Sequence, residues 1–260
     1  MDESYQIYLN RVARLPLPAT YQSQVQHIQE SPKFKPDESG ERQPVPFPGY
    51  TVITPPWGDD SENSTFYETL KVCQDQLLQQ FDSGFLVPVP PESFHLTLAD
   101  LIWDSAYRHA NQKPAFEEHL RSAIGKIFEQ SKPSISLGHP LRWQLLGLIV
   151  MPRAIAVGLL PKDEETYERI LQFRRCIYQN PGLIALRVEQ QYRFTAHITL
   201  GYFGNISPDL DRQALCNKLS EFNDQWVENY QELLAHRAEL RKFDDMTHYY
   251  RGPDWPVLEF

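Results

Sequence analysis

Apolar positions along the chain recur with a helical period in some stretches and with a strand period in others. The helical period marks residues 62–81, about 114–130, 163–178 and 208–226. Strand-like runs occupy residues 49–54, 93–101, 134–139, 142–151, 154–160, 193–203 and 232–243. Because helices alternate with strands and several strands adjoin, the pattern predicts an α+β fold with antiparallel sheet rather than a doubly wound parallel sheet.

The start of the chain does not continue this pattern. It has two short stretches of helical spacing, with Thr20 as the expected N-cap of the second helix. Residues 31–48 then contain five prolines among polar residues, which is typical of a linker or an extended wrap. The sequence therefore predicts an N-terminal extension over residues 1–48 and a main domain over residues 49–260.

Two of the predicted strands carry the same motif. The stretches SFHLTLADL and TAHITLGYF each have a histidine and, two positions later, a threonine among apolar residues. Because side chains alternate along a strand, His95 and Thr97 are expected on one face and the apolar residues on the other; His197 and Thr199 repeat this arrangement. One such pair is more often a structural pair, but two in matching strands favour a shared site.

The residue types suit phosphoester chemistry without a metal. Histidine titrates near neutrality, so one imidazole can take a proton from an attacking water or hydroxyl while another gives a proton to the leaving oxygen. Threonine hydroxyls can bind the non-bridging phosphate oxygens as charge builds on them.

The two motifs, about a hundred positions apart, resemble those of the two-histidine phosphoesterase superfamily, which includes RNA 2',3'-cyclic phosphodiesterases and 2'-5' RNA ligase-like proteins. The resemblance implies two pseudo-symmetric lobes of antiparallel sheet with outer helices around a central cleft, and no cofactor. It implies that His95 and His197 are the acid–base pair, in either order, and that Thr97 and Thr199 bind phosphate. The extension over residues 1–48 is not part of the family pattern, and we expect it to pack on the back of a lobe rather than over the cleft.

Three further residues are weaker candidates for substrate binding. Tyr50 heads a predicted strand and can offer its ring to a base, or belong to the core. Phe203 shares a predicted face with His197 and is expected to line the cleft, with Tyr202 pointing into the core. Arg153 lies in a long stretch without Asp or Glu, where it either binds phosphate or sits exposed in a turn.

The composition of the chain limits the classes of substrate and binding partner that we expect. A net charge of −9 disfavours binding of long duplexes and leaves a small nucleotide or a short oligonucleotide as the expected substrate. No apolar run is long enough to span a membrane, and the start of the chain does not read as a signal peptide. Three distant cysteines fit reduced thiols in the cytoplasm. A zinc site is not expected, because Asp100 is predicted on the strand face opposite His95.

The sequence thus favours a metal-independent phosphodiesterase that acts on a cyclic phosphate or a short 2'-5' or 3'-5' linkage. Two alternatives stay open. One is a non-catalytic protein that binds a nucleotide or an RNA end, and the other is a structural protein whose His–Thr pairs bond inside the core. Two histidines in a shared open site would exclude the last.

Overall fold

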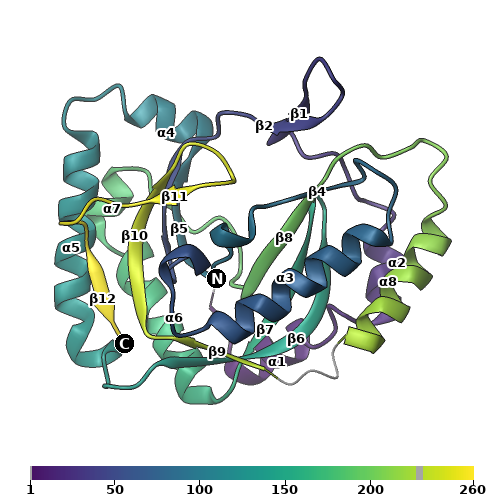
Figure 1. Cartoon of the computed structure of the whole chain (residues 1–260). Coiled ribbons are helices and arrows are strands. Elements are labelled where there is room, and N and C mark those ends of the chain that lie inside the picture. Colours follow the sequence, from purple (N-terminus) through teal and green to yellow (C-terminus); the bar gives the residue numbers. More distant parts are fainter. Residues whose placement is uncertain (1, 227–230) are drawn as a thin grey trace.

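Two five-stranded sheets form the framework of the computed structural model, which describes residues 2–226 and 231–260 (Figure 1). The first sheet has the order β11-β10-β3-β5, with β12 also paired to β10, and comprises β3 (Gly49–Ile53), β5 (Thr97–Trp103), β10 (Arg237–Phe243), β11 (Tyr249–Tyr250) and β12 (Val257–Glu259). The second has the order β4-β8-β7-β6-β9 and comprises β4 (Leu86–Pro88), β6 (Leu141–Met151), β7 (Ala154–Pro161), β8 (His197–Phe203) and β9 (Glu232–Ala235). All these pairings are antiparallel, which confirms the predicted α+β class.

Helices surround the two sheets. The longer ones are α3 (Ser64–Gln79), α5 (Phe116–Ile135), α6 (Glu164–Tyr178) and α8 (Arg212–Trp226), and the shorter ones are α1 (Tyr5–Val12), α2 (Pro18–Gln24), α4 (Asp104–Ala110) and α7 (Pro181–Ala185). Short 3-10 turns η1 (Trp57–Asp59) and η2 (Pro91–Ser93) and a small hairpin of β1 (Phe34–Pro36) with β2 (Arg42–Pro44) complete the fold. No helix among the residues in view is both long and apolar enough to cross a bilayer.

The two lobes repeat one unit. In the first, β3 leads through α3 to β5, and β3 pairs antiparallel with β5. In the second, β7 leads through α6 to β8, and β7 pairs antiparallel with β8. Each motif strand therefore follows the helix of its own unit, and Figure 1 shows β5 on the side of the first sheet that faces the second.

The helices of these units cross between the lobes. Helix α3 packs against β4 and β8 of the second sheet, and α6 contacts β5 of the first sheet as well as β6 and β7. Their apolar faces join one continuous core that includes Leu70 and Leu77 from α3 and Ile170 and Phe173 from α6. Burial of these faces joins the two lobes, because α6 contacts strands of both sheets and α3, which follows β3 of the first sheet, packs on the second sheet.

The N-terminal helices pack on the second lobe. The Tyr21 hydroxyl donates to Leu148 O at 2.7 Å, and the Tyr8 ring lies 4.8 Å from that of Tyr167 in α6. The expected cap was wrong: α2 begins at Pro18, and the Thr20 hydroxyl donates to a carbonyl of the preceding turn.

The strand predicted over residues 134–139 is also wrong. Helix α5 continues to Ile135, and Ile135 is fully buried together with Phe128 and Ser131, which precede it at helical spacing. Alternating Ser and Ile residues resemble a strand locally, but burial along one helix face decides the structure here.

Candidate active site

Both motif histidines are held by the same backbone contact. The Nδ1 of His95 lies 2.6 Å from Ser93 O, and the Nδ1 of His197 lies 2.7 Å from Thr195 O, in each case the carbonyl two residues earlier. A ring nitrogen that faces a carbonyl must carry its proton, which leaves Nε2 as the nitrogen that exchanges protons. Both side chains are half-buried. The two lobes therefore present two imidazoles in the same tautomer.

Each motif strand contains a bulge at the same position. In β5, Thr97 is paired with Ile53 and Ala99 with its neighbour Val52, so Leu98 is the extra residue. In β8, Thr199 and Gly201 are paired with adjacent residues of β7, so Leu200 is the extra residue. An extra residue shifts the side chains that follow it to the other face of the strand.

The bulge reverses two predicted orientations in β8. Phe203 is 1% exposed and packs against the Phe85 ring at 5.5 Å, so it belongs to the core instead of lining the site. Tyr202, expected in the core, is half-buried and receives the Lys33 ammonium over its ring at 5.0 Å. The prediction assumed that side chains alternate strictly between the two faces of the strand, and the extra residue Leu200 breaks this alternation.

The equivalent bulge moves Asp100 onto the face of Thr97. Both residues are half-buried, whereas Leu98 and Ala99 between them are fully buried, and the prediction that Asp100 faces away from His95 was wrong. Its carboxylate accepts a hydrogen bond from the Tyr192 hydroxyl. Within residues 2–226 and 231–260, no group of three or more His, Cys, Asp or Glu side chains is placed to hold a metal ion.

Buried helix side chains hold both bulges. The Gln74 side chain in α3 donates to Leu200 O at 2.7 Å and to Val89 O at 2.9 Å. Arg174 in α6 donates through Nη1 to Leu98 O at 2.6 Å. Gln74 is 2% exposed and Arg174 is 4% exposed. A bulged carbonyl leaves the regular ladder, and a buried donor from the helix satisfies it.

The environments of the two histidines differ. Burial lowers the pKa of His95 to about 4, and the positive charges of His197 and Arg241 act in the same direction against the Ser93 carbonyl. Burial also lowers the pKa of His197, with Lys33 acting in the same direction, but the Thr195 carbonyl and the Asp100 carboxylate oppose this shift. His95 is therefore neutral at pH 7, and His197 is the histidine with a carboxylate that favours its protonated form.

Residues of the C-terminal strands and of the extension lie near the motif histidines, although they belong to neither motif. The Tyr249 ring lies 4.3 Å from the His95 ring. Phe34 packs in a cluster with Phe243 and Met246, which Tyr202 and Val87 of the second sheet join, so residues of the extension contact both lobes. Nothing in the local sequence marks these residues, because only the fold brings them to the histidines.

The remaining predicted site residues lie elsewhere. Tyr50 is fully buried between the rings of Tyr107 and Trp255, which makes it a core residue and leaves no face for a base. Arg153 is exposed in the turn between β6 and β7, where its Nη2 lies 3.4 Å from Gln29 Oε1 of the extension. The structure thus gives both residues structural contacts.

Comparison with known proteins finds a family model that matches part of the chain. A family model described as 2H-phosphodiest, a domain of unknown function (DUF1868), matches residues 33–121, which include the motif at His95. No curated protein matches the sequence significantly.

Several solved structures are similar to this chain at low sequence identity. A conserved protein of unknown function from Agrobacterium tumefaciens aligns with a TM-score of 0.52 and 17% identity over 88% of this chain and 94% of its own. The protein TT0787 of Thermus thermophilus aligns with a TM-score of 0.43 and 15% identity over 74% and 86% of the two chains. E. coli LigT, solved with 3'-AMP, aligns with a TM-score of 0.40 and 16% identity over 82% and 95%. The family model thus covers the lobe that carries the motif at His95, and the second lobe repeats the same strand pairing with the motif at His197.

Proposed function

We propose that the protein is a metal-independent phosphodiesterase that hydrolyses a cyclic phosphate or a short oligonucleotide phosphodiester. The observation that carries this proposal is the identical Nδ1 contact of His95 and His197, each followed two residues later by a half-buried threonine. Two imidazoles with their Nε2 atoms free for proton exchange are what concerted acid–base catalysis requires.

The local electrostatics favour one assignment of roles. His95 is neutral at pH 7 and acts as the base, taking a proton from the attacking water as its oxygen bonds to phosphorus. His197, whose protonated form the Asp100 carboxylate favours against the effect of burial, acts from that protonated form as the acid and protonates the leaving oxygen as the bond from phosphorus to that oxygen breaks. Exchange of one proton with solvent at each histidine restores the starting state.

The phosphate is stabilised by neutral and charged donors. The hydroxyls of Thr97 and Thr199 donate to the non-bridging oxygens, since each lies on the same strand face as its histidine. Lys33 adds a positive charge near His197, which favours negative charge on the phosphoryl group in the transition state. A small nucleotide or a short oligonucleotide fits this site, in keeping with the negative charge of the whole chain.

The proposal keeps residues 49–260 as the phosphoesterase domain and residues 1–48 as an extension that adds Lys33 to it. The family match supports a role for the end of the extension, because it begins at residue 33. Three unpaired cysteines, Cys73, Cys176 and Cys216, support a cytoplasmic location.

The test is hydrolysis of 2',3'-cyclic nucleotides and 2'-5' oligonucleotides in the presence of EDTA. We expect activity to survive EDTA and to fall by about 10²–10⁴-fold in His95→Ala and in His197→Ala. The double variant should lose little more than either single one, because the two groups act in one step. His119→Ala, at an exposed histidine of α5, is the matched control and should keep full activity.

Two outcomes would contradict the proposal. Wild-type turnover in either motif variant would show that the two histidines do not act as an acid–base pair. Tight nucleotide binding without turnover of any substrate would instead identify a nucleotide-binding protein.

A further inference from the structure

A surface pocket lies beside Tyr249, the aromatic neighbour of His95. Tyr249, whose ring contacts that of His95, also lines a surface pocket of about 380 Å³. Its other walls come mainly from β10, β11 and the residues around them, and they include Arg237, Arg241 and Arg251. Tyr249 is therefore a residue that contacts His95 and also lines this pocket.

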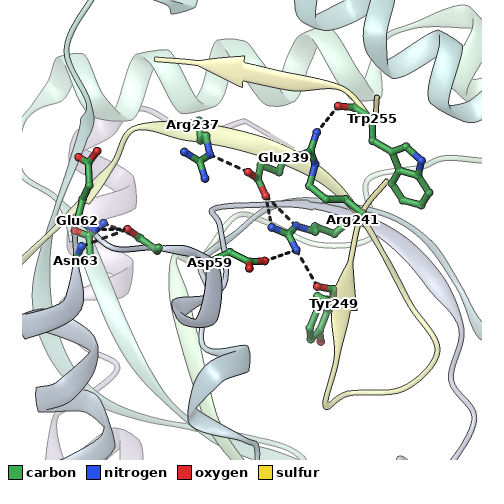
Figure 2. Close-up of polar contacts among 10 residues, drawn as sticks. Asp59, Glu62, Asn63, Arg237, Glu239, Arg241, Tyr249 and Trp255 are labelled. Carbon is green, nitrogen blue, oxygen red and sulfur yellow. Dashed lines mark hydrogen bonds and ion pairs between the residues drawn. The ribbon is translucent and has the colours of Figure 1, made fainter. Parts of the chain in front are cut away.

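Part of the pocket lining is a network of paired charges, and Figure 2 shows its contacts. Glu239 is 2% exposed and accepts hydrogen bonds at 2.8 Å from Arg237 Nε and at 2.8 Å from Arg241 Nε. Arg241 also donates to Asp59 at 2.8 Å and to Tyr249 O at 3.0 Å. Two arginines and two carboxylates balance each other here, so the network fixes the position of Tyr249 and leaves little net charge.

Arg251 does not take part in this network of paired charges. Its Nη2 donates to Trp255 O at 2.6 Å, and its buried Nε has no hydrogen-bond partner in the described part of the chain. A guanidinium has five N–H donors in a fixed fork, and a backbone carbonyl satisfies only one of them. The pocket therefore has one positive charge more than its two carboxylates neutralise, and Arg251 retains donors for an oxyanion.

Aromatic rings complete the lining. The rings of His248 and Tyr250 are stacked with their centroids 5.5 Å apart at an angle of 18°. Tyr249, whose ring contacts that of His95, is a third aromatic residue of the lining. Arginine beside stacked aromatic rings suits a group that is both anionic and planar, such as a phosphorylated nucleoside.

We propose that this pocket binds a second phosphate of the substrate, held by Arg251, next to the phosphodiester that lies between the histidines. The inference rests on the proposed function and names the substrate class more closely. The preferred substrate is a nucleotide or oligonucleotide that carries a further phosphate, rather than a nucleoside cyclic phosphate alone.

The experiment compares two ligands that differ by one phosphate. Binding of adenosine 3'-monophosphate and adenosine 3',5'-bisphosphate to the full chain is measured by calorimetry, which needs no turnover. We expect wild type to bind the bisphosphate about tenfold more tightly, as one charge-assisted contact supplies. Arg251→Gln should abolish this difference without changing the affinity for the monophosphate.

Three controls keep the test specific. Arg251→Lys should retain part of the preference, because it keeps the charge and loses the fork. Arg14→Gln, at an exposed arginine of the extension, should retain all of it. The melting temperature of each variant shows whether it is folded.

Failure of this inference is distinct from failure of the proposed function. Equal affinity of wild type for the two ligands, or equal weakening of both by Arg251→Gln, would overturn the second-phosphate subsite even if hydrolysis is found. Absence of hydrolysis with the expected difference in binding would leave the subsite in place and remove the catalytic proposal.

Discussion

Gln74 and Arg174 make the same contact in opposite lobes. Each is a buried side chain of a helix that crosses between the lobes, and each donates to the carbonyl of a bulged leucine, Leu200 and Leu98 respectively. In both strands that leucine immediately follows the motif threonine. The pseudo-symmetry of the molecule thus extends from the histidines to the groups that support them, although the two supporting residues differ in chemical type.

Removal of either contact should slow catalysis more than it weakens binding. In Gln74→Leu or Arg174→Met the bulged carbonyl stays buried without its donor, which costs about 1–3 kcal/mol of unfolding free energy. The strand should then relax and displace the adjacent threonine, so we expect kcat to fall about tenfold or more with little change in KM. Kinetics together with urea unfolding measure both effects.

A structural contact without influence on the site would give another result. Stability would fall, while kcat of the folded variant stayed at the wild-type value. Arg174→Lys should restore part of kcat, since it returns a donor to Leu98 O. Gln172→Leu, at an exposed residue of the same helix, is the matched control and should change neither quantity.

Most of the fold follows from local patterns. Helix α3 and strands β6 and β7 lie where the period of apolar residues predicts them, because each buries one continuous face or run in a common core. The error over residues 134–139 has the opposite cause, since a short stretch with Ser and Ile has no period long enough to separate a strand from the end of a helix.

Only the residues of the repeated motif could be predicted as members of the candidate site. The sequence places His95 and His197 together because the motif occurs twice. It does not reveal that a bulge after each threonine turns Tyr202 toward the site and Phe203 into the core, since bulges depend on pairing with another strand. Lys33 could not be foreseen either, because a lysine in a proline-rich stretch carries no local signal of its position.

The low pKa of His95 predicts a pH dependence of stability. Its pKa is about 4 in the folded protein against 6.5 for an unperturbed imidazole, and burial is the main cause. As pH falls below 6.5 the unfolded chain takes up this proton first, so stability decreases from there to about pH 4 and changes no further below it on account of this group. Urea unfolding of wild type and of His95→Asn at pH 7 and pH 4.5 checks this.

His95→Asn should lose less stability over that interval than wild type, since asparagine does not titrate. His119→Asn, at an exposed position, should follow wild type. If wild type and His95→Asn lost the same unfolding free energy between pH 7 and pH 4.5, His95 would not be buried as a neutral group.

Lys33 should influence both the histidine and the phosphate. Its positive charge contributes to the lowered pKa of His197, so Lys33→Met should raise that pKa, which NMR titration of the imidazole measures directly. The same change should lower kcat/KM by about tenfold through loss of one favourable charge near the phosphoryl group. Lys35→Met is the matched control, because Lys35 is exposed and lies two residues further along the chain, in β1. An unchanged pKa of His197 would place the Lys33 charge too far from the site to act.

Tyr202 and Phe203 should respond to substitution in opposite ways if the bulge at Leu200 sets their orientation. Phe203→Ala removes a ring that is 1% exposed in the core and should cost about 3–5 kcal/mol of unfolding free energy. Tyr202→Ala removes a half-buried ring on the face of His197, so it should cost less stability and raise KM for a nucleotide substrate. Urea unfolding and steady-state kinetics on both variants measure the contrast. The reverse outcome would be a loss of stability in Tyr202→Ala and a raised KM in Phe203→Ala. It would show that side chains alternate regularly along β8 and that the bulge at Leu200 does not set the orientation of these two residues.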